Sequence, residues 1–217
     1  MSRRTLILAL ALVFAFFLAA IGIYAAWPRH ADLRRFEPAD IARLETAMWR
    51  DYYEKRYGAL FGHLYELSRT QFGFSPLDSF RIALAAAQAA KAFQPTRSRE
   101  AANAALPALV SYYRLLASAT PGGFDAGEAA RLELDWWQAR REAVRPRQYG
   151  VTVARVAAIT YGKPADDPSL LISGIGRAEA MAYRDARGQA MTDPDWSEIK
   201  CRLRRAYRSL KTAVAGN

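Results

Sequence analysis

The dominant pattern of the chain is an uninterrupted apolar segment from Thr5 to Trp27, about 23 residues without a charged side chain. An α-helix rises about 1.5 Å per residue, so this segment would extend roughly 34 Å, enough to cross a hydrocarbon core of about 30 Å. The pattern therefore predicts a transmembrane helix that holds the rest of the chain at a membrane.

The flanks of this segment bear on whether it is a signal anchor or a cleavable signal peptide. Arg3 and Arg4 precede it and Pro28 comes directly after it, as in both classes. A cleavable apolar region usually contains about 7–15 residues, whereas this one is longer, and its best cleavage site is Ala20-Ile21-Gly22. We therefore expect a retained anchor, with cleavage near Gly22 as the alternative. The expected organisation is a basic tail at 1–4, a transmembrane signal anchor at 5–27, a juxtamembrane linker at 28–38 and an α-helical domain at 39–217.

Basic residues flank the segment in nearly equal numbers, so the positive-inside rule gives only a weak preference for its orientation. A short basic tail before a first apolar segment favours export of the domain, whereas Arg29, Arg34 and Arg35 favour the opposite orientation. We expect a single-pass protein of a bacterial-type inner membrane with a periplasmic domain, and a cytoplasmic domain is the alternative.

Beyond the anchor, apolar positions recur every three or four residues, and Pro and Gly fall between the periodic segments. No alternating pattern indicates a strand, so we predict an all-α domain built as a bundle of about six or seven helices. The alternative is a short α-solenoid of helical hairpins, because hairpins starting near Leu77, Asp125 and Ser169 would be roughly 45 residues apart. The expected helices span about 38–72, with a bend near Gly58 or Gly62, and about 76–93, 97–119, 125–144, 148–161, 169–186 and 193–214. Asp125 and Glu128 have the spacing of a capping box at the start of one of them.

The chain is basic, with 31 Lys and Arg against 21 Asp and Glu and a formal net charge of +10. For a membrane-tethered domain the nearest anionic surface is the phospholipid headgroup layer. A basic stripe on the last predicted helix consists of Lys200, Arg204, Arg208 and Lys211, which we interpret as a solvated face or a contact with anionic lipid or an acidic protein. Nucleic acid is not favoured, because no RNA- or DNA-binding motif is present and the arginines are interleaved with acids.

The strongest candidate for a binding site is the stretch Leu132–Glu142, which places Glu133, Trp137 and Arg140 on successive turns of one helix. Glu133 would lie at the edge of the apolar stripe, where an unpaired carboxylate is costly, so we expect Arg140 or Arg184 to pair with it. We hypothesise that a polar cluster binds a small ligand, and the simpler interpretation is salt bridges that fix helix register. The predicted cluster consists of Glu45, Glu133, Trp137, Arg140, Arg184 and Asp185.

Motifs for other chemistry are lacking in the sequence. The two histidines, His30 and His63, do not form the Glu-x-x-His pairs of di-iron bundles, and Cys201 is a single cysteine. Gly174-Ile175-Gly176 is too short for a phosphate-binding loop, and we expect it to allow a bend or a close helix contact. We predict no catalytic residue, no metal and no cofactor.

These patterns support two functional hypotheses. The first is a membrane-anchored binding or scaffolding module of the cell envelope without catalytic activity. The second is an anchored small-ligand receptor or enzyme that uses a polar cluster around Glu133 and Arg184. A cavity with several converging polar groups would favour the second, whereas charged pairs closed against each other would favour the first.

Overall fold

The computed structural model describes residues 3–27 and 29–215, which are helical and connected by turns, with no strand among them. The predicted all-α fold with a helical bundle is therefore confirmed. Parts of the predicted tail, linker and domain, namely residues 1–2, 28 and 216–217, lie outside the described residues. The helices are α1 (Arg3–Ala26), α2 (Pro38–Tyr53), α3 (Tyr57–Glu66), α4 (Pro76–Phe93), α5 (Arg99–Ala102), α6 (Leu106–Ala117), α7 (Ala126–Arg141), α8 (Pro146–Tyr161), α9 (Pro168–Arg187) and α10 (Asp193–Ala215), with a π-helical segment η1 (Leu67–Gln71) and a 3-10 segment η2 (Asn103–Ala105).

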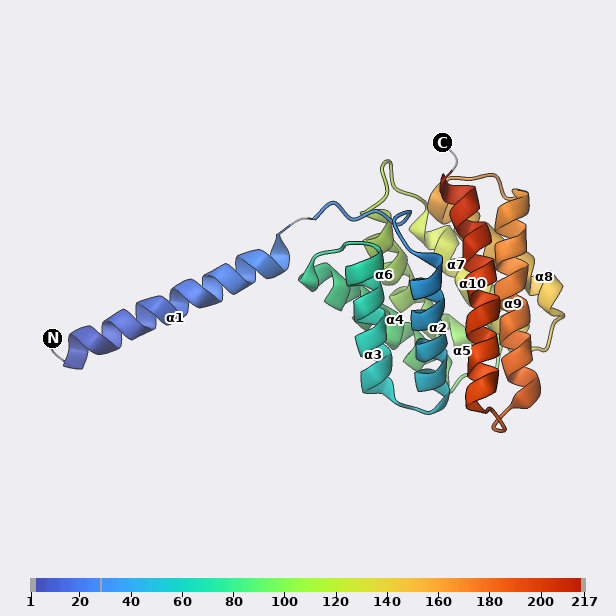
Figure 1. Cartoon of the computed structure of the whole chain (residues 1–217), viewed down its shortest axis with the longest axis horizontal. Coiled ribbons are helices and arrows are strands. Elements are labelled where there is room, and N and C mark those ends of the chain that lie inside the picture. The colour runs from blue at the N-terminus through green and yellow to red at the C-terminus, as the bar shows by residue number, and fades with distance from the viewer. Residues whose placement is uncertain (1–2, 28, 216–217) are drawn as a thin grey trace.

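Helix α1 projects away from the domain (Figure 1). It has 24 residues, and the segment Arg4–Ala26 is long and apolar enough to cross a membrane. None of this segment is buried against the domain. A single apolar helix near the N-terminus is compatible with a single-pass anchor, and a signal peptide has the same features.

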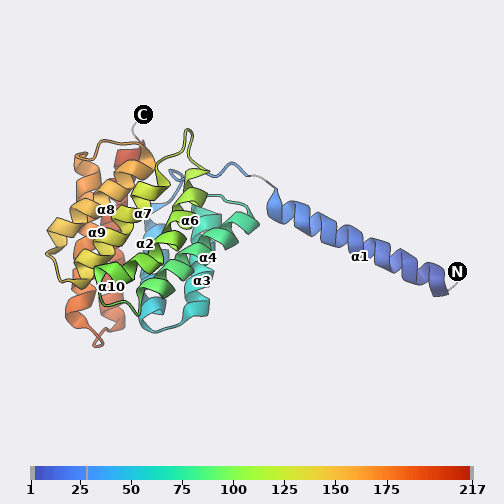
Figure 2. The ribbon, with the colours of Figure 1, turned by 180° about the vertical axis from the view of Figure 1, so that it is seen from behind.

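The domain consists of two layers of helices that close into a ring. Helices α3, α2, α10 and α9 form one layer, and α4, α6, α7 and α8 form the other (Figures 1 and 2). Each of these helices packs against the next one along the ring, and α10 returns to pack against α2. Because the last helix of the domain packs against its first, the array is a closed bundle and not the open α-solenoid considered as the alternative.

The segment predicted as one helix over residues 38–72 is divided into α2, α3 and η1. The break between α2 and α3 lies at residues 54–56, where Lys55 adopts φ = 57° and the Arg56 N–H donates to the Asp51 carbonyl at 2.8 Å. The buried carboxylate of Asp51 also accepts hydrogen bonds from the Arg56 side chain at 2.7 and 2.9 Å and lies 2.8 Å from His63 Nδ1. These contacts stabilise a sharp turn at which no Gly or Pro signals a break.

Side-chain caps stabilise the N-terminal ends of α7 and α10, which belong to different layers of the bundle. Asp125 accepts a hydrogen bond from the Glu128 N–H at 2.8 Å, as the predicted capping box requires, but the carboxylate of Glu128 binds a neighbouring arginine instead of reaching back. A reciprocal box forms at the start of α10. There the Asp195 carboxylate accepts from the Thr192 N–H at 3.0 Å, and the Asp195 N–H donates to the Thr192 hydroxyl at 3.4 Å.

Helices α8 and α9 approach each other closely at Gly150 and Gly174. A Cβ atom on Gly174 would lie 2.4 Å from the Gly150 carbonyl oxygen and 2.6 Å from the Ala154 nitrogen, distances at which the backbones would have to move apart. The expected role of Gly174 in a close helix contact is therefore confirmed. Arg177 lies three residues after Gly174 on the same side of α9, so this contact brings Arg177 close to the interior.

The segment expected to be a free juxtamembrane linker is partly built into the domain. Leu33 and Phe36 are buried, at 4% and 0% exposure, although both precede the predicted start of the domain. The Asp32 N–H donates to the Phe72 carbonyl at 2.9 Å, and the Tyr161 hydroxyl donates to the Leu33 carbonyl at 3.2 Å. The segment 29–37, called the tether below, is therefore fixed onto the helical ring by buried side chains and by hydrogen bonds.

Candidate ligand-binding pocket

A pocket of about 380 Å³ lies between the two layers, and residues from every helix of the ring line it. Its wall is mostly apolar and rich in aromatic side chains, and four charged residues also face it. The aromatic residues include Trp49, Tyr52, Phe93, Tyr112, Trp136 and Trp137, and the charged ones are Glu45, Glu133, Arg140 and Arg177. A second concavity lies along α1, between Phe16 and Arg29. Its described lining residues include no converging group of polar side chains.

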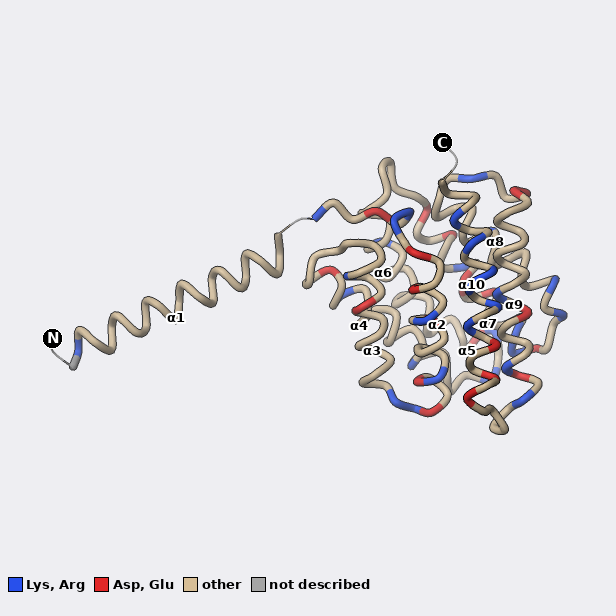
Figure 3. Tube along the Cα trace, viewed as in Figure 1, with Lys and Arg blue, Asp and Glu red and all other residues tan. Residues whose placement is uncertain are grey.

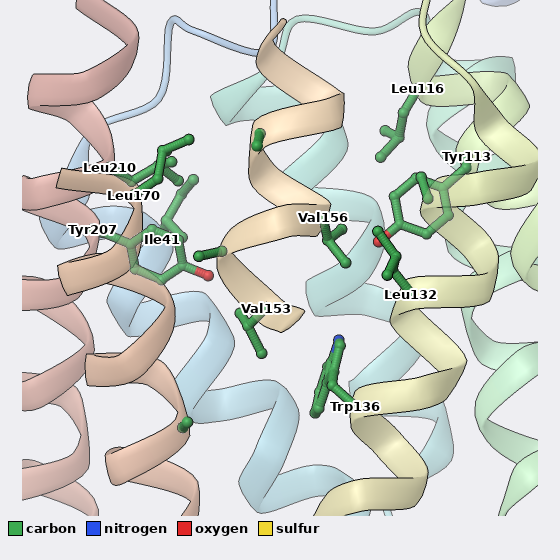
Figure 4. Close-up of a cluster of buried hydrophobic side chains, with 14 of the residues drawn as sticks. Ile41, Tyr113, Leu116, Leu132, Trp136, Val153, Val156, Leu170, Tyr207 and Leu210 are labelled. Atoms are coloured by element: carbon green, nitrogen blue, oxygen red, sulfur yellow. The ribbon is translucent and has the colours of Figure 1, made fainter. Parts of the chain in front are cut away.

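Aliphatic side chains from both layers form the core around this pocket. Figure 4 shows Ile41, Tyr207 and Leu210 on one side of α8 and Tyr113, Leu132 and Trp136 on the other, with Val153 and Val156 between them. The hydroxyl of Tyr113 and the indole nitrogen of Trp136 are both directed into the space that faces Val156 (Figure 4). Polar atoms therefore reach an interior that aliphatic groups otherwise fill.

The first polar group in the wall joins α2, α9 and α10. Glu45 is 5% exposed, and its carboxylate accepts a hydrogen bond from Arg177 at 2.6 Å and one from the Tyr207 hydroxyl at 2.5 Å. Burial acts to lower the pKa of the Arg177 guanidinium, but the charge of Glu45, its hydrogen bond and the nearby Tyr207 and Glu133 together hold that pKa well above its usual value. This region is an ion pair closed by a tyrosine.

The second polar group is the Glu133 carboxylate on α7, which has only neutral partners. It accepts hydrogen bonds from the Tyr113 hydroxyl at 2.9 Å, from Trp136 Nε1 at 2.9 Å and from Trp137 Nε1 at 3.0 Å. Burial raises the pKa of Glu133, and these hydrogen bonds and the charge of Arg177 oppose the rise without cancelling it. Among the described residues, no ion pair includes Glu133.

The predicted polar cluster is divided between two places. Glu45, Glu133 and Trp137 line the pocket together, as the hypothesis required. Arg140 lines the pocket too, but it donates to the Asp185 carboxylate at 2.8 and 2.6 Å and to the Tyr53 hydroxyl. The Arg184 guanidinium lies over the Tyr53 ring, 3.2 Å from its centroid, and 3.4 Å from Asp185.

The expectation that Arg140 or Arg184 would pair with Glu133 is wrong. Arg140 lies two helical turns after Glu133, and its guanidinium extends toward the C-terminal end of α7, where Asp185 of α9 binds it. Glu133 is compensated by two indole N–H groups of its own helix and by a tyrosine of α6. The hydrogen-bond partners of this buried carboxylate are therefore neutral donors.

Sequence reasoning did not identify Arg177, Tyr207 and Tyr113, which are central to the pocket. A signal for Arg177 was present, because it continues the spacing Leu170, Gly174, Arg177 and Met181 that marks the buried side of α9. A charged residue at an apolar position of a helix indicates a buried partner or a ligand. No comparable local signal distinguishes Tyr113 or Tyr207 from ordinary core tyrosines.

The basic stripe of α10 is also divided. Lys200, Arg204 and Arg208 are exposed, and basic positions recur along α10 in Figure 3. Lys211 instead donates to the carbonyl oxygens of Arg34 and Phe36, at 2.7 and 2.9 Å. Lys211 is therefore half-buried, and its ammonium group fixes the segment before α2 to α10.

The described part of the chain contains no cluster of metal-ligating side chains. Across residues 3–27 and 29–215, no group of three or more His, Cys, Asp or Glu side chains could hold a metal ion. Neither a protein-family model, nor a curated protein, nor a solved structure matches the chain.

Proposed function

We propose that the domain is a membrane-anchored receptor for a small, mostly apolar ligand that binds in the central pocket. The observation that carries the proposal is the pocket itself. Its volume of about 380 Å³ falls within the range of about 300–1,000 Å³ typical of ligand sites. Its wall combines an apolar lining with the few converging polar groups that such sites use to orient a ligand.

The energetics of the pocket support binding over a purely structural role. Apolar side chains beside an unfilled space lose packing contacts, and a ligand in the pocket would restore them. Residues Ala86, Ala90 and Ala157 line the pocket with minimal side chains where larger ones would fill it. Moreover, Arg177 Nε is buried without a hydrogen-bond partner in the described part of the chain. A ligand would fill the space and leave the closed Glu45–Arg177 pair intact.

The proposal is tested by measuring ligand binding to the unaltered chain and to a variant whose pocket is partly filled by a larger side chain. The full chain, in nanodiscs of neutral lipid, is titrated with 2-naphthol while tryptophan emission is monitored, because Trp49, Trp136 and Trp137 line the pocket. We expect saturable quenching that is at least tenfold weaker in Ala90→Leu. Ala87→Leu, on the same helix but outside the pocket lining, should bind as the unaltered chain does. Quenching that does not saturate, or equal binding by Ala90→Leu, would overturn the proposal.

We also propose that α1 is retained as a single-pass anchor in a bacterial-type inner membrane and that the domain faces the periplasm. The length of α1 and the short basic segment before the apolar run support this placement. Intact mass of the membrane-bound protein tests retention, and a soluble form that begins after Gly22 would contradict it. A compartment-sensitive reporter fused to the C-terminus tests the side, and activity confined to a cytoplasmic reporter would contradict export.

A binding or scaffolding module remains the second candidate, and the exposed basic side chains of Lys200, Arg204 and Arg208 favour it. Such a face attracts anionic lipid headgroups or an acidic protein, with about 1 kcal/mol per basic residue near a membrane surface. Replacing the three residues with Gln should reduce binding of the full chain in nanodiscs to vesicles that contain anionic lipid. Unchanged vesicle binding would remove this candidate and leave the pocket proposal untouched.

A further inference from the structure

We infer that the ligand of this pocket is a monocation with an apolar body, such as an alkylammonium or arylammonium, whose charged head binds Glu133. The inference rests on the proposed receptor function and specifies the class of its ligand. Its basis is the ion pairing in the pocket, the hydrogen-bonding capacity of Glu133 and the side chains around that carboxylate.

One acid of the pocket has no ion pair. Among the described residues that line the pocket, Glu45 pairs with Arg177 at 2.6 Å, and Arg140 pairs with Asp185 at 2.6 Å, whereas no ion pair includes Glu133. A cationic head would give Glu133 an ionic partner, whereas an anionic ligand would place a second carboxylate beside it in a low-dielectric interior.

The hydrogen bonds of Glu133 leave space for one further donor. A carboxylate offers about four lone-pair directions. Oε2 of Glu133 accepts from Tyr113 and Trp136, whereas Oε1 accepts only from Trp137. The remaining direction at Oε1 fits a single N–H of an ammonium head, which would form a charge-assisted hydrogen bond there.

Aromatic rings around Glu133 suit the same head group. Trp136 and Trp137 contact each other edge to face with ring centroids 6.1 Å apart, and Trp137 packs against Phe93 at 5.0 Å. Tyr112 and Tyr113, 5.1 Å apart, form the adjoining wall. Electron-rich ring faces attract cations, and aromatic side chains beside a carboxylate are a general means of binding ammonium groups.

Protonation of Glu133 would remove the negative charge that the cation needs. The other titratable or charged groups that line the pocket are Glu45 and Tyr52 of α2, Tyr112 and Tyr113 of α6, Arg140 of α7, Tyr161 of α8, Arg177 of α9 and Tyr207 of α10. Burial raises the pKa of each of these five tyrosines above its usual value, so they stay neutral. Acidification that protonates Glu133 should therefore weaken binding of the cation.

The test compares three probes that share one eight-carbon chain and differ in charge: octylammonium, 1-octanol and octanoate. Each is titrated at pH 7 into the full chain in nanodiscs of zwitterionic lipid, and the signal of empty nanodiscs is subtracted. We expect octylammonium to bind at least tenfold more tightly than 1-octanol, and octanoate to bind more weakly than both. Glu133→Gln should reduce octylammonium binding to the level of 1-octanol and leave 1-octanol unchanged. Glu128→Gln, an exposed acid of the same helix, should change neither.

The outcomes separate this inference from the receptor proposal. Binding of 1-octanol or octanoate as tight as that of octylammonium overturns the cationic ligand and leaves the receptor standing. Failure of all three probes to bind counts against the receptor itself. If thermal unfolding shows that Glu133→Gln does not fold, the test uses the unaltered chain and measures how binding of octylammonium and of 1-octanol depends on pH. Octylammonium binding must weaken as Glu133 becomes protonated while 1-octanol binding stays constant, and parallel profiles would overturn the inference.

Discussion

Two carboxylates face the same pocket and are stabilised in opposite ways. Glu45 has a full ionic partner in Arg177 and a hydrogen bond from Tyr207, so its charge is neutralised inside the protein. Glu133 has three neutral donors, and burial raises its pKa. The first region closes on itself and joins helices that are far apart in sequence. The second keeps an uncompensated acid beside an open volume, as expected of a binding group.

The largest expected effect comes from breaking the closed region. Arg177→Met leaves the Glu45 carboxylate buried without its cation, and removal of one partner of a buried pair costs about 3–5 kcal/mol. We expect the free energy of unfolding of the full chain, measured in urea, to fall by that amount. Glu45→Gln combined with Arg177→Met should recover part of the loss, because no unpaired charge remains.

The matched control for this experiment is an exposed ion pair. Arg131 binds Glu128 at 3.0 Å on the surface of α7, where both side chains are exposed to solvent. Exposed pairs contribute about 0–1 kcal/mol, so Arg131→Met should change stability by less than about 1 kcal/mol. A loss no larger for Arg177→Met than for Arg131→Met would show that the Glu45 region is not a stabilised pair.

The next effect disturbs the helix contact that positions Arg177. Gly174→Ala places a Cβ atom 2.4 Å from the Gly150 carbonyl oxygen, so α8 and α9 must separate, and overpacking of this kind costs about 1–3 kcal/mol. Gly62→Ala is the control, since a Cβ there meets nothing within 4 Å and alanine favours a helix by roughly 0.5–1 kcal/mol. Urea unfolding should therefore change in opposite directions for the two variants, and a change in the same direction would contradict the close contact.

Much of the fold was predictable because its signals are local. The apolar length of α1, the N-cap at Asp125 and the left-handed Gly162 after α8 each depend on residues within one or two turns. The break after α2 was not predictable in this way. Gly58 indicated a bend nearby, but the position of the break at residues 54–56 depends on the buried Asp51 carboxylate, which accepts hydrogen bonds from Arg56 and contacts His63 of the next helix.

The candidate site was predictable in its acids but not in their partners. Glu45 and Glu133 each lie at the edge of an apolar stripe, which predicts that they are buried. Apart from the two indoles of α7, their partners come from α6, α9 and α10, so these partners depend on the closure of the ring and on the approach of α9 to α8. Arg184 was the arginine of α9 expected to pair with Glu133, whereas Arg177 is the arginine of α9 that lines the pocket.

A smaller effect is expected from the raised pKa of Glu133. The folded state retains the Glu133 proton in a pH range where the unfolded chain has lost it, so stability from neutral Glu133 is present below the usual pKa of glutamate and is lost as pH rises through the folded value. The unfolding free energy of the unaltered chain should therefore fall relative to Glu133→Gln as pH rises from the usual pKa of glutamate, about 4, through the raised pKa of the folded state. Glu45 and the other acids are common to both proteins, so the difference reports Glu133. A difference that does not change with pH would contradict an uncompensated carboxyl.

The smallest expected effect on stability comes from Lys211. Like Glu133, this charged residue has only neutral hydrogen-bond partners, but it lies closer to solvent. The Lys211 ammonium donates to the carbonyl oxygens of Arg34 and Phe36 and lies 5.0 Å from the centroid of the Phe36 ring, whereas Lys200 on the same stripe is exposed. Lys211→Met should lower the free energy of unfolding by about 1 kcal/mol, because partly hydrated hydrogen bonds contribute modestly. Lys200→Met should change it by less than about 0.5 kcal/mol. Hydrogen exchange of the amides in residues 32–37 should rise in Lys211→Met alone, since the carbonyls that fix the tether lose their donor. Equal protection in both variants would mean that burial of Leu33 and Phe36 holds the tether without help from the charge.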